Sequence, residues 1–379
     1  MDKDEELARE IGRAGQAGRV DYARVERLLH EGADPNASWE GASLLHALGS
    51  CRDPSSAQAA RALVEFGADV ESRGAGGATP LGAAAMAGNP TLCAELVRRG
   101  ANLGARDEAG CDPMARALER LDEEVAQMLL EAGYPAPGCR DALGRPALVA
   151  VAERPRAAGV ACEFLHRGAD PDGADEDGWT PLATAARAGN PAMAVVLLDA
   201  GVDPRAPGPF GLGALAIALG ARALASKPGA ARVGPAHISC ALALARRMGG
   251  GWGSAPDAGG WPPLARLYRS IARFEPVWMG ELERAGADAL AAGHEGWGLL
   301  RLAAEVGPEA SGIELARWAI ARGASPAERC GRGALPEDAA LSSGRFELHG
   351  LLRSEREGRE LARALADAGA EGRGRAGRL

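Results

Sequence analysis

The sequence predicts an all-α solenoid of about nine or ten similar helix pairs joined by hairpin loops. A glycine recurs at near-constant spacing along the 379-residue chain, and a second glycine, followed by a small residue and often by Asp or Asn, recurs between its copies. The first set is Gly41, Gly77, Gly110, Gly144, Gly178, Gly211, Gly260, Gly296 and Gly333. Each unit holds two predicted helices of roughly ten residues, each with one apolar face. Helices of this length are too short to be stable in isolation. The units must therefore pack on one another.

The unit that begins at Gly178 shows how each element is specified. Thr180 is suited to cap the first helix, and Pro181 to its first turn, where no backbone N–H is needed. Gly189 can adopt the left-handed conformation that ends this helix. Asn190, followed by proline, caps the second helix in the same way. The sequence therefore predicts two short helices and a loop.

The segments Thr79-Pro80-Leu81 and Thr180-Pro181-Leu182, in units of about 33 residues, resemble the ankyrin repeat. The resemblance covers nearly the whole chain, and it implies helix pairs, hairpin loops and protein binding through a concave face. One feature departs from the family. The histidine that follows Thr-Pro-Leu is kept only as His46, so fewer hydrogen bonds between repeats and a softer array are expected. The other repeats carry Gly82, Ala115, Val149, Ala183, Ala216, Ala265 and Arg301 there.

The repeats divide the chain into six predicted regions. These are an N-terminal capping repeat at 1–41, regular repeats at 42–211, a long repeat with an insertion at 212–260, further repeats at 261–333, a C-terminal capping repeat and extra helix at 334–370, and a disordered tail at 371–379. The long repeat owes its extra length to Arg222–Pro235, which is rich in Ala, Gly and Pro. The extra helix, about 355–368, is expected to cover the open end with Leu361, Leu365 and Ala368.

Composition narrows the classes of partner. A net charge of −8 and an isoelectric point near 5.5 argue against nucleic acid and against an anionic membrane surface. The seven cysteines are odd in number and widely spaced, which favours reduced thiols and a cytoplasmic location. The N-terminus lacks the features of a signal peptide, and the apolar run Leu212–Leu219 is too short to span a membrane.

The sequence contains no pattern that predicts catalysis, a metal or a cofactor. No nucleophile elbow, zinc-protease helix or phosphate-binding loop occurs. Cys162 and His166 are four residues apart on one predicted helix and could supply two metal ligands, but no further ligand has matching spacing. Asp107, Asp141 and Asp175 recur every 34 residues, three before the turn glycine, and are predicted to form hydrogen bonds within the hairpins.

Three tryptophans directly follow turn glycines, namely Trp179, Trp261 and Trp297. In ankyrin repeats this position lies at the edge of the concave face, and large aromatic side chains are favoured binding anchors. Packing of the rings against adjacent hairpins remains open as the other interpretation. By the same family mapping, the residues that line the concave face near the ends of first helices are Met86, Glu119, Arg187, Arg269 and Glu305.

The resemblance and the composition together predict a non-catalytic, monomeric scaffold that binds a protein partner. The alternative is an enzyme or small-molecule receptor with a pocket near the 222–260 insertion. A third and weaker interpretation is nucleic-acid binding through the arginine-rich surface and tail, against which the net charge argues.

Overall fold

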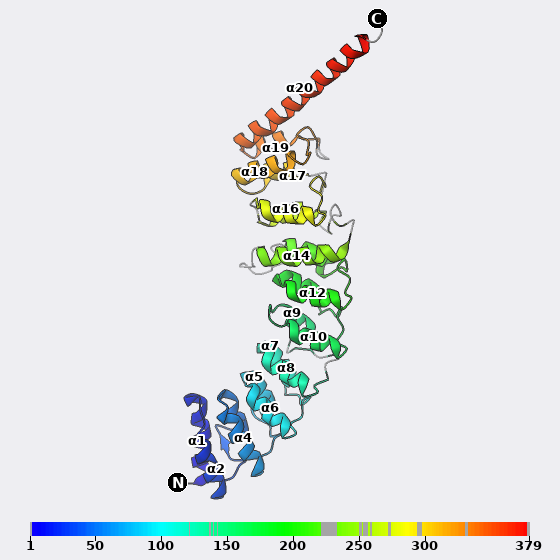
Figure 1. The fold of residues 1–379 in the computed structure, drawn as a ribbon. Coiled ribbons are helices and arrows are strands. Elements are labelled where there is room, and N and C mark those ends of the chain that lie inside the picture. The colour runs from blue at the N-terminus through cyan, green and yellow to red at the C-terminus, as the bar shows by residue number, and fades with distance from the viewer. Residues whose placement is uncertain are drawn as a thin grey trace. The chain divides into compact units, whose positions relative to one another are not determined.

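In the part of the chain that the computed structural model describes, the regular elements are almost all helices (Figure 1). It describes residues 2–120, 122–135, 138, 140–141, 143–220, 233–249, 252, 257, 260–271, 274–293, 298–329 and 333–376. The chain divides into two compact units, Met1–Thr184 and Ala185–Leu379, and the boundary falls inside one helix, α11 (Pro181–Ala188).

The first unit contains five helix pairs and the start of α11. Its helices are α1 (Lys3–Ala17), α2 (Tyr22–His30), α3 (Leu44–Ala47) with a 3-10 turn at Leu48–Ser50, α4 (Ser55–Glu65), α5 (Pro80–Ala87), α6 (Pro90–Arg98), α7 (Pro113–Arg120), α8 (Glu123–Glu131), α9 (Ala147–Ala152) and α10 (Ala158–His166). A short antiparallel hairpin joins β1 (Ser38–Trp39) to β2 (Ala42–Ser43), and a 3-10 turn lies at Ala75–Gly77. First helices pack on first helices and second on second, as α5 on α7 and α6 on α8 show.

The second unit is also built of stacked helix pairs. It contains α12 (Pro191–Asp199), a 3-10 turn at Pro209–Gly211, α13 (Ala214–Gly220), α14 (Pro235–Met248), α15 (Pro263–Ile271), α16 (Pro276–Arg284), α17 (Leu299–Glu305), α18 (Glu309–Ile320), α19 (Pro336–Ser342) and α20 (Phe346–Ala376). The insertion predicted at Arg222–Pro235 falls between α13 and α14, and its residues 221–232 lie outside the described part of the chain.

The core of each unit is a single layer of aliphatic side chains between successive helix pairs. Leu81 and Leu96 are fully buried in the first unit, as are Leu244 and Leu302 in the second. Small residues such as alanine fill the space between them, which lets the short helices approach closely. Because each pair covers only its neighbours, the stability of every pair depends on the next one.

Asparagine caps join successive repeats. The Asn89 carboxamide oxygen accepts a hydrogen bond from the Leu92 N–H at 3.1 Å and thereby caps α6, as predicted for the Asn-Pro pair. Its amide nitrogen donates to the Cys51 carbonyl of the preceding repeat at 2.6 Å. Asn190 caps α12 through the Met193 N–H at 3.1 Å. One buried side chain therefore both starts a helix and links two repeats.

The C-terminal prediction needs correction. Residues 371–376, expected to begin a disordered tail, are the last residues of the continuous helix α20, and 377–379 lie outside the described residues. Two ion pairs at i, i+4, Arg353–Glu357 at 2.8 Å and Arg356–Glu360 at 2.9 Å, support this helix. Extending a formed helix costs little, because each added residue gains one hydrogen bond.

The open end of the last repeat is covered by a different part of α20 from the one predicted. Leu348 and Leu352 are fully buried, whereas Leu361 and Leu365 are 62% and 66% exposed. The side chain of Ala368, the third residue predicted there, lies outside the described part. Arg359 donates to the Ala324 and Ile320 carbonyls at 3.1 and 3.2 Å, so the contact with the repeats extends to this residue.

Candidate functional site

An aspartate organises each of several hairpins. The Asp175 N–H donates to the Trp179 carbonyl at 3.1 Å, and the Asp175 carboxylate accepts the Trp179 N–H at 2.8 Å. Asp107 and Asp141 make the same two bonds, so the predicted role of these three aspartates is confirmed. Asp257 does the same for Trp261, with both distances 3.1 Å. Asp257 also lies three residues before a turn glycine, Gly260, so the same spacing could have identified it from the sequence.

The second carboxylate oxygen of two aspartates pairs with an arginine on the following first helix. Arg116 on α7 donates to Asp107 at 2.6 and 2.9 Å, and Arg266 on α15 pairs with Asp257. Burial by itself would raise the pKa of Asp107, but Arg116 and the Cys111 N–H outweigh it and hold that pKa below its usual 3.8. Each pair fixes a hairpin to the helix that follows it.

The described tryptophans of the predicted row are half-buried. Trp261 contacts Arg269, whose guanidinium carbon lies 4.0 Å from the ring centre. The ring also lies close to Gly293, where a Cβ atom would come within 2.8 Å of Trp261 Cε3. Trp261 is therefore partly packed and partly exposed. Trp179 is half-buried on its hairpin, and Trp297 lies outside the described residues.

The other predicted contact residues lie at the ends of first helices, as expected from the family. Met86 on α5 is 46% exposed, and the exposed Glu119 on α7 pairs with Arg116 at 2.7 Å. Glu305 on α17 pairs with Arg301 at 2.7 Å.

Two further members of the set lie in the second unit. Arg187 is half-buried on α11, and its carbonyl accepts a hydrogen bond from His237 Nε2 at 3.1 Å. Partial desolvation and the neighbouring Arg266 lower the pKa of Arg269. Within the predicted set, the structure brings Trp261 and Arg269 into contact.

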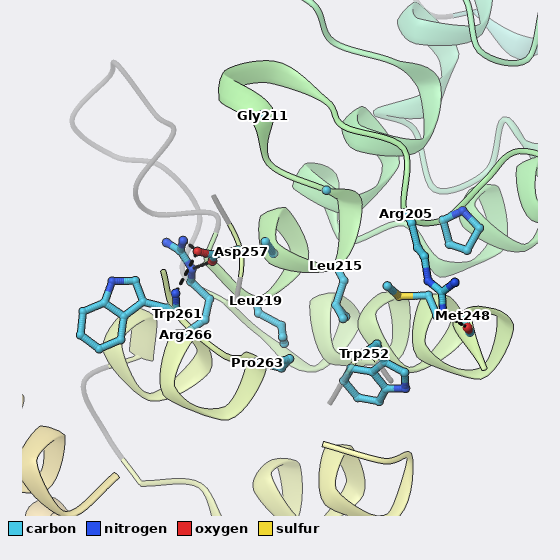
Figure 2. Close-up of a pocket in the computed structure, with 13 residues that line it drawn as sticks. Arg205, Gly211, Leu215, Leu219, Met248, Trp252, Asp257, Trp261, Pro263 and Arg266 are labelled. Atoms are coloured by element: carbon cyan, nitrogen blue, oxygen red, sulfur yellow. Dashed lines mark hydrogen bonds and ion pairs between the residues drawn. The ribbon is translucent and has the colours of Figure 1, made fainter. Parts of the chain in front are cut away.

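A pocket of about 330 Å³ opens in the second unit beside α13, the helix after which the insertion begins in the sequence (Figure 2). Its apolar wall comes from α13, α14, α15 and the loop between α14 and α15, through Leu215, Leu219, Met248, Trp252 and Pro263. Arg205 and the Asp257–Arg266 pair also line it. Trp252 is only 4% exposed and does not follow a turn glycine, so the repeat pattern could not have singled it out.

The described residues contain no group of three or more His, Cys, Asp or Glu side chains that could hold a metal ion. The cysteines described as free are Cys51, Cys93, Cys111, Cys162 and Cys240. Burial raises the pKa of Cys93 and of Cys240 to about 12, which keeps both as unreactive thiols. Across the described ranges, every helix is too short or too polar to cross a membrane.

Curated relatives match short parts of the chain. The ADP-ribosylation factor GTPase-activating protein AGD4 of Arabidopsis thaliana is 34% identical over 110 residues, which are 28% of this chain and 14% of that protein. A putative ankyrin repeat-containing protein of Treponema pallidum is 36% identical over 98 residues, 26% of this chain and 32% of its own length. The matched segments thus span at most about a third of these relatives.

Solved structures of ankyrin repeat domains resemble larger parts of the chain. The human ASB11 domain is 23% identical with a TM-score of 0.46, covering 64% of this chain and 98% of that one. The Bcl-3 domain is 23% identical with a TM-score of 0.44, covering 54% and 92%.

Family models match the chain directly. Residues 76–108 match the model of a single ankyrin repeat, and residues 114–207 match a model of three copies. The matched residues extend from α5 to α12, where capped helix pairs alternate with hairpins anchored by aspartate. Residues 76–108 and 114–207 of this chain are therefore ankyrin repeats.

Proposed function

We propose that this protein is a non-catalytic scaffold that binds a protein partner through the face made by its first helices and hairpin tips, which is concave in ankyrin repeats. The observation that carries the proposal is the Trp261 side chain. It is held on an aspartate-anchored hairpin, half-buried, with the Arg269 guanidinium 4.0 Å from its ring centre. The turn does not require an indole, because Ala42 and Ala78 occupy the equivalent position in other repeats.

A preformed anchor favours binding for a physical reason. An aromatic ring buries a large area and loses little side-chain entropy, and a neighbouring arginine supplies donors for a partner's carboxylate or carbonyl groups. Because Asp257 and Arg269 already hold Trp261 in place, little ordering remains to be done on binding. Trp179, Met86 and Glu119 in the first unit, and Arg187, Trp297 and Glu305 in the second, complete the proposed contact set.

The test compares Trp261→Ala with Trp318→Ala, after affinity capture from the native host and mass spectrometry have identified the partner. Trp318 is a matched control, because an arginine also lies over its ring, with Arg322 Cζ at 3.8 Å from the ring centre, but on a second helix, α18. Trp261→Ala is expected to weaken partner binding by about 2 kcal/mol or more, with a small effect on unfolding. Trp318→Ala should leave the affinity unchanged.

The opposite outcome identifies a packing residue. If Trp261→Ala lowers the unfolding temperature strongly and the folded fraction keeps its affinity, the tryptophan row is not the interface. A buried tryptophan replaced by alanine typically costs about 3–5 kcal/mol of stability.

The remaining parts of the proposal are a monomeric state, a cytoplasmic location and no nucleic-acid or membrane partner. The net charge of −8 and the free cysteines support them. One observation favours the second candidate function, a small-molecule receptor, and that is the pocket beside α13.

A further inference from the structure

We infer that the pocket beside α13 binds a small molecule that has an apolar body and one anionic group. This site lies beside the proposed protein-binding row and shares Trp261 with it. The inference rests on the origin of the pocket, on its lining and on its charge.

The pocket opens where the family's histidine is missing. In an early repeat His46 bridges two hairpins, because its Nε2 donates to the Ala78 carbonyl at 2.8 Å and its Nδ1 accepts from Ser43 Oγ at 2.7 Å. Ala216 stands at the equivalent position on α13, and the carbonyl equivalent to that of Ala78 belongs to Trp261. Without an imidazole the space between these two hairpins stays open.

Exposure separates Ala216 from the other alanines that replace this histidine. Ala115, Ala183 and Ala265 are only 3%, 1% and 1% exposed, so neighbouring groups close over them. Ala216 is half-buried and lines the pocket. Missing imidazoles alone therefore do not make a pocket. At Ala216 the pocket is also lined by Trp252, which follows α14 in the chain.

The lining suits an apolar ligand of modest size. Leu215 and Leu219 on α13 face Met248, Trp252 and Pro263 across the space (Figure 2). A volume of about 330 Å³ lies at the lower end of the range of small-molecule sites. An indole beside aliphatic side chains gives a flat, polarisable wall that favours an aromatic or branched aliphatic body.

The charged lining favours an anion. The charged side chains in the described lining are those of Asp257, Arg266 and Arg205, so cations outnumber anions by one. Arg205 lies next to Met248 and donates to its carbonyl at 2.6 Å, which holds the side chain at the end of the pocket near Trp252. A carboxylate or sulfonate at this end would meet a fixed positive charge beside an apolar wall. The ligand class is therefore a small amphiphilic monoanion.

The experiment measures binding of 8-anilinonaphthalene-1-sulfonate, an aromatic monoanion, to the full chain by fluorescence titration. N-phenyl-1-naphthylamine, which lacks the sulfonate, is the neutral probe. Wild type is expected to bind the anion with saturable stoichiometry near one and to bind the neutral probe more weakly. Trp252→Phe should reduce energy transfer from tryptophan to the bound anion more than Trp318→Phe does, because Trp252 lines the pocket and Trp318 does not.

Two variants test the site itself. Ala216→His should fill the pocket as His46 fills its own repeat, and should weaken anion binding about tenfold or more. Ala292→His, an exposed position outside the pocket, is the matched control and should have no effect. If Ala216→His does not unfold cooperatively by circular dichroism, Ala216→Phe replaces it, since it fills the space without a hydrogen bond.

A second pair of variants tests whether the pocket recognises the anionic group of the ligand. Arg205→Gln should weaken binding of the sulfonate about two- to fivefold and leave the neutral probe unchanged. Arg329→Gln is its control, because Arg329 is also exposed and also donates to a backbone carbonyl, that of Gly333 at 2.6 Å. If the sulfonate binds a folded Ala216→His or Ala216→Phe variant as tightly as wild type, the pocket beside α13 is not the binding site. Equal losses for both probes with Arg205→Gln would overturn the monoanion class.

Discussion

At the scale of single residues, polar side chains in this protein act as links between backbone segments. Asp107 and Asp257 close a hairpin with one carboxylate oxygen and hold a first helix with the other. His46 and Asn89 reach from one repeat to the backbone of another. The aspartates were predictable from their fixed distance to the turn glycine, whereas their arginine partners were not, because Arg116 and Arg266 have no counterpart in the other repeats' sequence pattern.

The His46 ring gives a prediction about pH. Burial lowers the pKa of His46 below its ordinary 6.5, and the hydrogen bond to Ala78 opposes this only in part. The folded protein therefore holds the neutral ring, while the unfolded chain takes up a proton more readily. This contribution to stability is present above pH 6.5 and is lost as the pH falls through the folded pKa.

The measurement is chemical denaturation of wild type and His46→Gln from about pH 7.5 to about pH 5. Wild type should lose more of its free energy of unfolding on acidification than the glutamine variant, which keeps a donor for Ala78 but does not titrate. Parallel pH profiles for the two proteins would show that His46 is not responsible for the loss.

At the scale of elements, capping residues fix where the short helices begin, whereas tertiary contacts anchor the long helix α20. Thr79, Asn89 and Asn190 cap their helices as their positions after loop glycines predict. The tail was mispredicted because composition alone cannot show that a helix already anchored by Leu352 and Arg359 continues to Ala376, beyond the last tertiary contact made by its described side chains. Only the region of the pocket was predictable, because the sequence shows that this repeat is longer than the others but not which residues line the pocket.

The two faces of α20 give a matched prediction. Leu352→Ala should reduce the free energy of unfolding by about 2–5 kcal/mol, because Leu352 is fully buried where α20 covers the repeats. Leu361→Ala, on the same helix but 62% exposed, should change it by less than about 0.5 kcal/mol. Urea denaturation monitored by circular dichroism compares them. Equal costs would mean that the exposed part of α20 is covered in solution.

At the scale of the whole molecule, the packing contacts of a repeat array are local. Each helix pair buries its apolar face against the pairs next to it, as α5 does against α7 and α13 against α15. Period and glycine spacing were enough to predict this architecture, because the same physical requirement repeats in every unit. The tryptophan row is different: Trp261 is half packed and half exposed, so the architecture alone does not assign its role, which the proposed binding test addresses.

Because packing contacts are local, a destabilising substitution in one unit should leave the other unit unaffected. Leu81 and Leu264 occupy the same repeat position in the first and second units, and they are 0% and 1% exposed. Replacing either by alanine should cost its own region about 2–5 kcal/mol. In native-state hydrogen exchange, Leu81→Ala should speed exchange in α4 to α7 and leave α17 to α20 unchanged. Leu264→Ala should speed exchange in α13 to α17, the neighbours of α15, and leave α4 to α7 unchanged. Because contacts run only between neighbouring pairs, uniform acceleration along the chain would show that the array opens as one cooperative body and that nearest-neighbour stacking does not describe its stability.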